Sequence, residues 1–188
     1  NMLGHHILEL IDLQEQYNTP LLYDASACGS IPVIRNLEEY YDNDLLFSVK
    51  GILNGSSNFI LSKIFNEKMG YKEALKLAQD LGFAESNPTL DIDGWDSLYK
   101  LIIITMHAFG VYVAPEEILT YGISTMNDAD IRFAHEKERR IKLVAHVEKV
   151  EDKLIMCVLP QLISRNKYIY SVEDEFNGVV IKGLFYDK

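Results

Sequence analysis

The chain has 188 residues, of which 48% are hydrophobic and 24% charged, so it is long enough for one ordinary domain or two small ones and has a globular composition. Its net charge of −10 argues against nucleic acid as a partner, because a phosphate-binding surface needs a basic patch. No apolar run is long enough to span a bilayer, which argues against a membrane protein.

The cysteines and histidines bear on the compartment and on metal binding. Cys28 and Cys157 are far apart in the sequence and lie in apolar settings, so we interpret both as reduced thiols. Because the chain also begins without a signal peptide, we expect a cytoplasmic protein. The five histidines show no zinc-ligand spacing.

Apolar spacing and turn residues predict the elements in chain order. Helices are predicted at 5–17, 32–41, 58–68, 71–81 and 95–109, at a short segment beginning at Pro115, and at 128–137. Strands are predicted at 21–27, 45–53, 141–145, 154–159 and 179–185. This order of helices and strands predicts a single domain over residues 1–188 with an α+β fold, in which helices pack on one face of a mixed β-sheet.

The stretch from 82 to 100 is unusually acidic for so short a segment. Four carboxylates and one lysine fall within it, namely Glu85, Asp91, Asp93, Asp96 and Lys100. The plain interpretation is an i,i+4 ion pair between Asp96 and Lys100 at a helix start, with acidic residues favoured by the helix dipole. The functional interpretation is a polar substrate site, because the residues after Lys100 are apolar all round and place this pair at the edge of a core.

The segment 51–61 runs from a strand through a small polar turn into a helix. One interpretation is a helix cap, in which Ser and Asn side chains satisfy the free N–H groups of the first turn. The other is a site where hydroxyl and N–H groups meet an anionic or polar ligand. No Gly-Lys-Ser/Thr is present, so this is not a Walker phosphate loop.

Three blocks, in order along nearly the whole chain, resemble segments of the homoserine dehydrogenase family. The first is Tyr23-Asp-Ala-Ser-Ala-Cys-Gly-Ser-Ile-Pro32, where the family has Tyr-Glu-Ala-Ser-Val-x-Gly-Gly-Ile-Pro. The second is Gly51-Ile-Leu-Asn-Gly-Ser-Ser-Asn-Phe-Ile-Leu61, similar to Gly-Ile-x-Asn-Gly-Thr-Thr-Asn-Tyr-Ile-Leu. The third is the acidic stretch 82–100, which resembles the signature segment of the family.

The resemblance also implies what this sequence lacks. The family begins with a Rossmann half that carries Gly-x-Gly-x-x-Gly, and this half is absent here, as is the Thr-Ala-Asn-Lys segment with its active-site lysine. We therefore expect a catalytic, substrate-binding and dimerisation region of a longer chain, from a monofunctional enzyme or from one fused to an aspartokinase. NADH or NADPH would bind mainly to the missing half, so residues 1–188 alone should not turn over.

The family reduces the aldehyde of L-aspartate 4-semialdehyde to the alcohol of L-homoserine. Negative charge develops on the carbonyl oxygen when hydride adds, and a cationic acid beside that oxygen would stabilise it. Lys100 matches the signature lysine and would be this acid. Asp96, one turn earlier, would orient Lys100 and keep it charged.

The resemblance also implies a set of substrate-binding residues. Glu85 and Asp91 match positions that hold the substrate, and a carboxylate suits its α-ammonium group. Gly55 and Ser56 would supply backbone and hydroxyl contacts. Phe83 stands near a position where the family often has tyrosine, so a phenolic contact there would be lost.

The first block matches the segment that binds a monovalent cation such as Na⁺ in the family, mainly through backbone carbonyls. Asp24 replaces the usual glutamate, and its side chain is shorter, but the Ala27 and Gly29 carbonyls remain available. The alternative interpretation of this segment is a strand end capped by a loop.

Two other functions compete with the enzyme interpretation. The first is a non-catalytic oligomerisation or regulatory module that retains the fold, which the full set of Glu85, Asp91, Asp96 and Lys100 argues against. The second is a carboxylate-rich Mg²⁺ site, which oxygen ligands alone would permit but which the Lys100 charge would oppose. In either enzyme or module, we expect a homodimer formed through the sheet, because the apolar tail strands would otherwise expose an edge.

Overall fold

The computed structural model describes residues 2–23, 25–29, 31–41 and 46–184, and within them five strands form one sheet in the order β2-β4-β3-β1-β5. The strands are β1 (Leu46–Ile52), β2 (Leu119–Thr120), β3 (Arg139–Val150), β4 (Lys153–Ser164) and β5 (Gly178–Gly183). Neighbouring strands are antiparallel except β2 and β4, which are parallel. The mixed sheet predicted from the sequence is confirmed.

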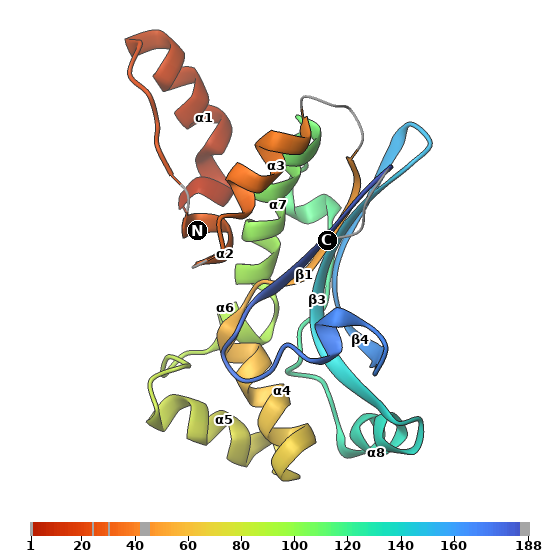
Figure 1. The fold of residues 1–188 in the computed structure, drawn as a ribbon. Helices are drawn as coiled ribbons and strands as arrows, with labels where there is room; N and C mark the ends of the chain where they lie inside the picture. The colour runs from red at the N-terminus through yellow and green to blue at the C-terminus, as the bar shows by residue number, and fades with distance from the viewer. Residues whose placement is uncertain (1, 24, 30, 42–45, 185–188) are drawn as a thin grey trace.

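Helices cover one side of this sheet, as predicted (Figure 1). They are α1 (Met2–Tyr17), α2 (Ala25–Cys28), α3 (Val33–Tyr41), α4 (Gly55–Glu67), α5 (Tyr71–Asp80), α6 (Thr89–Ile92), α7 (Trp95–Phe109) and α8 (Asp128–Glu136). Two short 3-10 turns lie at Pro115–Glu117 and Tyr168–Tyr170. Helix α1 projects away from the body of the molecule, and no described helix is long and apolar enough to cross a membrane.

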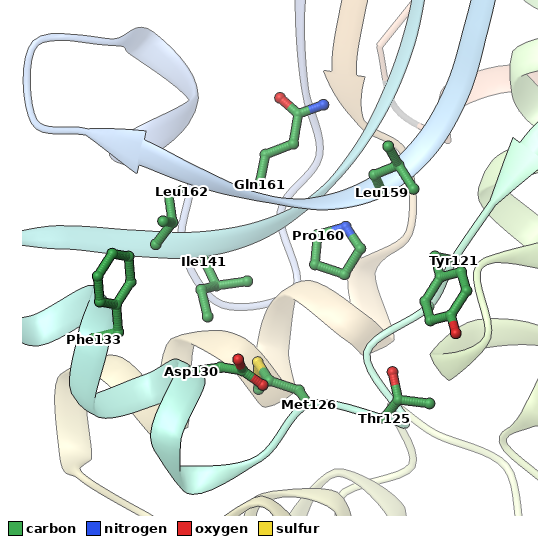
Figure 2. A pocket seen from close by; sticks show the side chains of 11 residues that line it. Tyr121, Thr125, Met126, Asp130, Phe133, Ile141, Leu159, Pro160, Gln161 and Leu162 are labelled. Carbon is green, nitrogen blue, oxygen red and sulfur yellow. The ribbon is translucent and has the colours of Figure 1, made fainter.

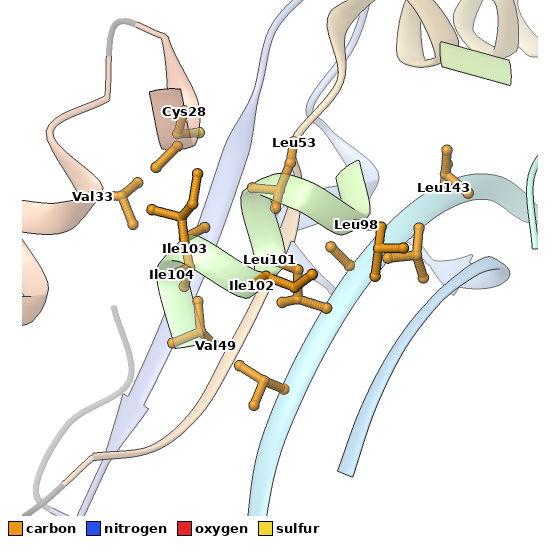
Figure 3. Packing of buried hydrophobic residues seen from close by; sticks show 14 of the residues in the cluster. Cys28, Val33, Val49, Leu53, Leu98, Leu101, Ile102, Ile103, Ile104 and Leu143 are labelled. Carbon is orange, nitrogen blue, oxygen red and sulfur yellow. The ribbon is translucent and has the colours of Figure 1, made fainter. Parts of the chain in front are cut away.

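Helix α7 lies at the centre of the core, between α3 and the sheet (Figures 1 and 3). Its side chains Leu98, Leu101, Ile102 and Ile104 have almost no exposed surface. The apolar run that follows Lys100 is therefore buried on all sides, as the sequence predicted. Burying each such side chain contributes about 1.5–3 kcal/mol relative to leaving it exposed, so α7 is held firmly in place.

The other face of the sheet carries only a small second cluster. Ile52, Val144, Ile163, Ile169 and Val172 pack together there, beneath the second 3-10 turn. The remaining part of this face is a groove of ≈ 830 Å³ whose lining includes Lys50, His146 and Glu148. Among the described residues, no α-helix lines this groove, although Tyr168 and Ile169 of the second 3-10 turn do.

The strand predicted at 21–27 is wrong. Residues 19–23 form neither helix nor strand and are attached to α1, since the Leu21 N–H donates to Gln14 Oε1 (2.7 Å). Leu22 is 87% exposed, and the residues from Ala25 form the single turn α2. Ala27, at the end of this predicted strand, is buried, and a short apolar run fits a buried helix turn as well as it fits a buried strand.

Two smaller differences concern the segments that flank the acidic stretch. Helix α4 begins at Gly55, three residues earlier than predicted, because the Asn54 side chain caps it by accepting from the Ser57 N–H (2.8 Å). The turn at Asn87-Pro88 leads into the one-turn helix α6, which was not among the predicted helices. The other predicted helices and strands are confirmed, most of them to within three residues at their ends. Strands β3 and β4 each continue five residues beyond their predicted ends, and the two-residue strand β2 was not predicted. The predicted strand ends at 45 and 185 lie outside the described residues.

Candidate active site

The part of the acidic stretch that joins α6 to α7 is held by close backbone contacts. Gly94 joins the two helices with a φ of +88°, a left-handed conformation that glycine adopts without strain. The Ile123 N–H donates to the Ile92 carbonyl (2.6 Å), and Gly122 passes so close that a Cβ there would lie 2.0 Å from the same oxygen. These contacts fix the backbone positions from which the Asp91 and Asp96 side chains extend.

Asp96 and Lys100 form the predicted pair, one turn apart on α7. Lys100 Nζ lies 2.8 Å from Asp96 Oδ2, and the two side chains keep 21% and 26% of their surface exposed. Lys100 Nζ also donates to the Leu53 carbonyl at the end of β1 (2.8 Å). An ammonium group has three donors, so one N–H of Lys100 has no partner among the described residues.

Asn54 joins this pair to Asp91. Its Nδ2 donates to Asp91 Oδ1 (2.7 Å) and to Asp96 Oδ2 (2.8 Å), while its side chain caps α4. The cap-forming turn was predicted from the sequence, but Asn54 was not among the predicted site residues. The available signal was weak, because an asparagine before a helix usually needs no explanation beyond capping.

The pKa of Asp91 is raised above its ordinary value, mainly because burial disfavours the charged carboxylate. The nearby Asp96 carboxylate raises it further by repulsion. Hydrogen bonds from Asn54 and Ser56, and the positive charge of Lys100, oppose this and lower it. The pKa of Asp91 is thus set by burial together with these four neighbours.

The remaining predicted substrate residues line the start of α4 and the loop opposite. Ser56 Oγ donates to the Phe83 carbonyl, which ties this loop to α4. The Phe83 ring stacks at a tilt on Phe59, with 4.6 Å between ring centroids. Gly55 has no room for a side chain, because a Cβ would lie 2.6 Å from the Glu175 carbonyl oxygen.

Glu85 and Asp93 behave differently from the other carboxylates. Glu85 is exposed, and within the described part of the chain its carboxylate makes no hydrogen bond or ion pair; only its carbonyl is engaged, by Gln79 Nε2 (3.1 Å). Asp93 instead accepts a hydrogen bond from Ser124 Oγ. The structure therefore brings Asp91, Asp96 and Lys100 together, leaves Glu85 available to a ligand and separates Asp93 from the cluster.

The proposed cation segment is only partly described. Asp24 lies outside the described residues, whereas Ala27 is buried in α2 and Gly29 follows it with a φ of +50°. In the described ranges, no group of three or more His, Cys, Asp or Glu side chains could hold a metal ion. The carboxylate-based Mg²⁺ alternative therefore has no ligand set in this part of the chain.

A separate hollow of ≈ 360 Å³ lies between α8 and β4 (Figure 2). Phe133, Met126 and Ile141 make most of its visible walls apolar. Its one acidic side chain, Asp130, already accepts from the Asn127 N–H (3.0 Å) in the capping box of α8. None of the site residues described above lines this hollow.

Comparison with known proteins gives one consistent family. Residues 32–188 match the family model described as homoserine dehydrogenase. Homoserine dehydrogenases of Helicobacter pylori and Bacillus subtilis are 40% and 37% identical over 97% and 93% of this chain, which correspond to 43% and 40% of their own lengths. The crystal structure of a homoserine dehydrogenase from Thiobacillus denitrificans has a TM-score of 0.92 at 34% identity, over 97% of this chain and 42% of that one.

A hyperthermophilic archaeal homoserine dehydrogenase mutant in complex with NADPH is also similar, with a TM-score of 0.78 at 28% identity over 96% of this chain. The fold and the matches thus define a class of protein, the oxidoreductases. The chain belongs to the homoserine dehydrogenase family. It spans less than half the length of the curated relatives that it matches.

Proposed function

We propose that this chain is the substrate-binding catalytic region of a homoserine dehydrogenase, which interconverts L-aspartate 4-semialdehyde and L-homoserine with NAD(P)H in threonine, methionine and isoleucine biosynthesis. The observation that carries the proposal is Lys100, whose ammonium is held by Asp96 and by the Leu53 carbonyl, with one N–H that has no partner in the described part of the chain. Family membership supports the reaction class.

The nicotinamide cofactor supplies the hydride in this reaction when it is bound. The residues of this chain do not fit it, because the sequence has no Gly-x-Gly-x-x-Gly turn that would lead into a helix N-terminus at the pyrophosphate. We infer that a nucleotide-binding half belongs to the same polypeptide. NADPH is named for the archaeal relative, which supports NADP(H) as one cofactor of the family.

The residues of this chain would bind the aldehyde and provide the proton. The free N–H of Lys100 would point to the carbonyl oxygen, stabilise the charge that develops there and donate a proton to it. Asp96 would hold Lys100 in place. Asp91 and the unpartnered Glu85 would receive the α-ammonium group, which suits the excess of negative charge around Lys100.

Gly55, Ser56 and Phe83 would complete the wall on which the substrate lies. The Ser56 hydroxyl already donates to the Phe83 carbonyl, so it would act on substrate as an acceptor. A monovalent cation such as Na⁺ would bind the Ala27 and Gly29 carbonyls, which lie at the end of α2, where helical carbonyls lack partners.

We also propose a homodimer formed through the sheet and a cytoplasmic location. The sheet face away from the helices supports the dimer, because no described α-helix lines its groove. The cysteines support the location, because both Cys28 and Cys157 are free thiols.

The test is Lys100→Met in the full-length enzyme. If Lys100 is the acid, kcat should fall about 10²–10⁴-fold with a smaller change in KM, because charge on the carbonyl oxygen develops mostly in the transition state. Glu85→Gln should instead raise KM more than it lowers kcat, since it holds the ammonium in both states. The measurement is steady-state oxidation of homoserine and reduction of the semialdehyde.

Lys76→Met is the matched control, because Lys76 forms an i,i+4 ion pair with Asp80 on exposed surface of α5. Lys76→Met should leave kcat unchanged, because it only removes an exposed ion pair that contributes about 0.2–0.5 kcal/mol to stability. Residues 1–188 alone should show no turnover. A folded Lys100→Met enzyme with most of its kcat would contradict the proposed acid, and inactivity of the unchanged full-length protein would favour a non-catalytic module.

A further inference from the structure

The turn between β1 and α4 touches every charged group at the centre of the site. Leu53 accepts from Lys100 through its carbonyl, and the next residue, Asn54, donates to Asp91 and Asp96. Asn54 is only 4% exposed, so its polar atoms depend on protein partners. One turn of backbone thus contacts residues that lie 37 to 47 positions away in the sequence.

The orientation of the Asn54 amide is fixed by its other end. Oδ1 accepts from the Ser57 N–H (2.8 Å), so the NH₂ group must face the two carboxylates. Each of its two hydrogens serves one carboxylate. Because Asp91 Oδ1 and Asp96 Oδ2 lie 2.7 Å and 2.8 Å from the same nitrogen, they are at most about 5.5 Å from each other.

We propose that Asn54 is a positioning residue of the site, which joins Asp91 and Asp96 into one unit and so fixes the substrate-binding carboxylate relative to Lys100. The proposal rests on the function proposed above for Asp91, Asp96 and Lys100. Asn54 itself needs no contact with substrate in this role. It acts through two carboxylates that come from different helices, α6 and α7.

The residue type argues for this role over simple capping. Serine and aspartate cap a helix as well as asparagine does, but neither supplies two hydrogens in addition to the capping oxygen. Two ionised carboxylates at this distance repel each other unless a donor lies between them. Lys100 does not bond both, because the contacts of its Nζ in the described residues are to Asp96 and to the Leu53 carbonyl.

Asn54→Ser separates the two roles, because it keeps a capping oxygen and removes both donors. Asn127→Ser is the control, since Asn127 also caps its helix, α8, through its side-chain oxygen and in the described residues bonds backbone N–H groups of that helix instead of the site carboxylates. We expect both variants to stay folded, with a larger fall in melting temperature for Asn54→Ser, because Asn54 is 4% exposed and Asn127 is exposed. Only Asn54→Ser should lower kcat/KM of the full-length enzyme, by about 10–100-fold, as expected for a misplaced catalytic group.

A second measurement is independent of activity. In ¹³C-aspartate-labelled protein, the carboxyl carbon of Asp91 should titrate at higher pH in Asn54→Ser than in the unchanged chain, because a hydrogen bond that favours the ionised form is lost while Asp96 still repels it. The acidic limb of the kcat/KM profile should move in the same direction. Asn127→Ser should leave both unchanged.

The outcomes distinguish this proposal from the one on which it rests. An unshifted Asp91 titration in Asn54→Ser would overturn it, whether or not kcat/KM falls, since any loss would then not act through the carboxylates. An unchanged kcat/KM in an active enzyme would overturn it as well. If the unchanged full-length protein has no dehydrogenase activity, the proposed function fails. The Asp91 titration still tests whether Asn54 links Asp91 to Asp96.

Discussion

Lys142 is the site of a sharp stability prediction, because it is a cation buried without a direct carboxylate partner. It lies on β3 with 1% of its surface exposed, and its Nζ donates to Asn58 Oδ1 (2.9 Å) and the Val172 carbonyl (2.6 Å). Burial lowers the pKa of Lys142 from its ordinary value of 10.5 to about 8, and the Arg140 charge adds to this. Glu173 and Asp174 oppose the shift but do not cancel it.

The direction in which the free energy of unfolding changes with pH follows from proton binding by Lys142 in the folded and unfolded chain. Between about pH 8 and 10.5 the unfolded chain keeps this proton while the folded chain releases it, so the free energy of unfolding rises with pH. Each pKa unit is worth about 1.4 kcal/mol, which gives a gain of about 3 kcal/mol across this window. The contribution is present above the unfolded pKa and is lost as pH falls toward 8.

The assay is urea unfolding of the unchanged chain and of Lys142→Met, at intervals from pH 7 to 10.5. The variant cannot release this proton, so the difference in unfolding free energy should move in favour of the unchanged chain by about 3 kcal/mol as pH rises. This slope does not depend on the hydrogen bonds that the variant loses at every pH. Titration of tyrosines and of Cys28 occurs in both proteins and is removed by the difference.

Lys63→Met is the control, because a hydrogen bond from Lys63 to Glu67 raises the pKa of Lys63 instead of lowering it. The difference in unfolding free energy between the unchanged chain and Lys63→Met should not move in favour of the unchanged chain between pH 8 and 10.5. A flat difference for Lys142→Met over the same range would refute the claim that burial of this charge opposes folding.

Two further predictions concern packing and assembly. Gly122→Ala should destabilise the chain by about 1–3 kcal/mol or more in urea unfolding, because its Cβ would lie 2.0 Å from the Ile92 carbonyl oxygen. Gly70→Ala is the control. A Cβ at Gly70 would have nothing within 4 Å, so this change should be neutral or slightly stabilising. Sedimentation at roughly tens of micromolar, where a standard interface should hold, should show a dimer, and a species that remains monomeric would contradict assembly through the sheet.

The elements that local sequence pattern determines were predicted correctly. Helix α7 is an apolar run between Gly94 and Gly110, and both glycines adopt the left-handed conformation at its ends. The hairpin of β3 and β4 follows from alternating residues on either side of a charged turn. The Asp96–Lys100 pair was predictable because spacing of four on one helix is enough to place two side chains together.

Long-range contacts explain what the sequence could not predict. The residues before α2 join no sheet, and the Leu21 N–H instead bonds the Gln14 side chain, a contact that no periodicity reveals. Asn54 meets Asp91 across 37 positions, and Lys142 meets Asn58 across 84. A lysine in an alternating strand is normally solvent-facing, so its burial depends on the Asn58 and Val172 oxygens that the fold brings to it.

The start of α4 links the sheet to the site. Asn54 holds the two carboxylates, and Asn58, one turn later, accepts from Lys142 and donates to the carbonyls of Val172 and Phe176. Gly55 lies between them, where the segment that ends at Phe176 leaves no space for a side chain. Any shift of β3 or of the 172–176 segment would therefore move the first turn of α4, and with it the amide that spaces Asp91 from Asp96. The position of Lys100 depends on the same turn, because the Leu53 carbonyl ends the strand that enters it.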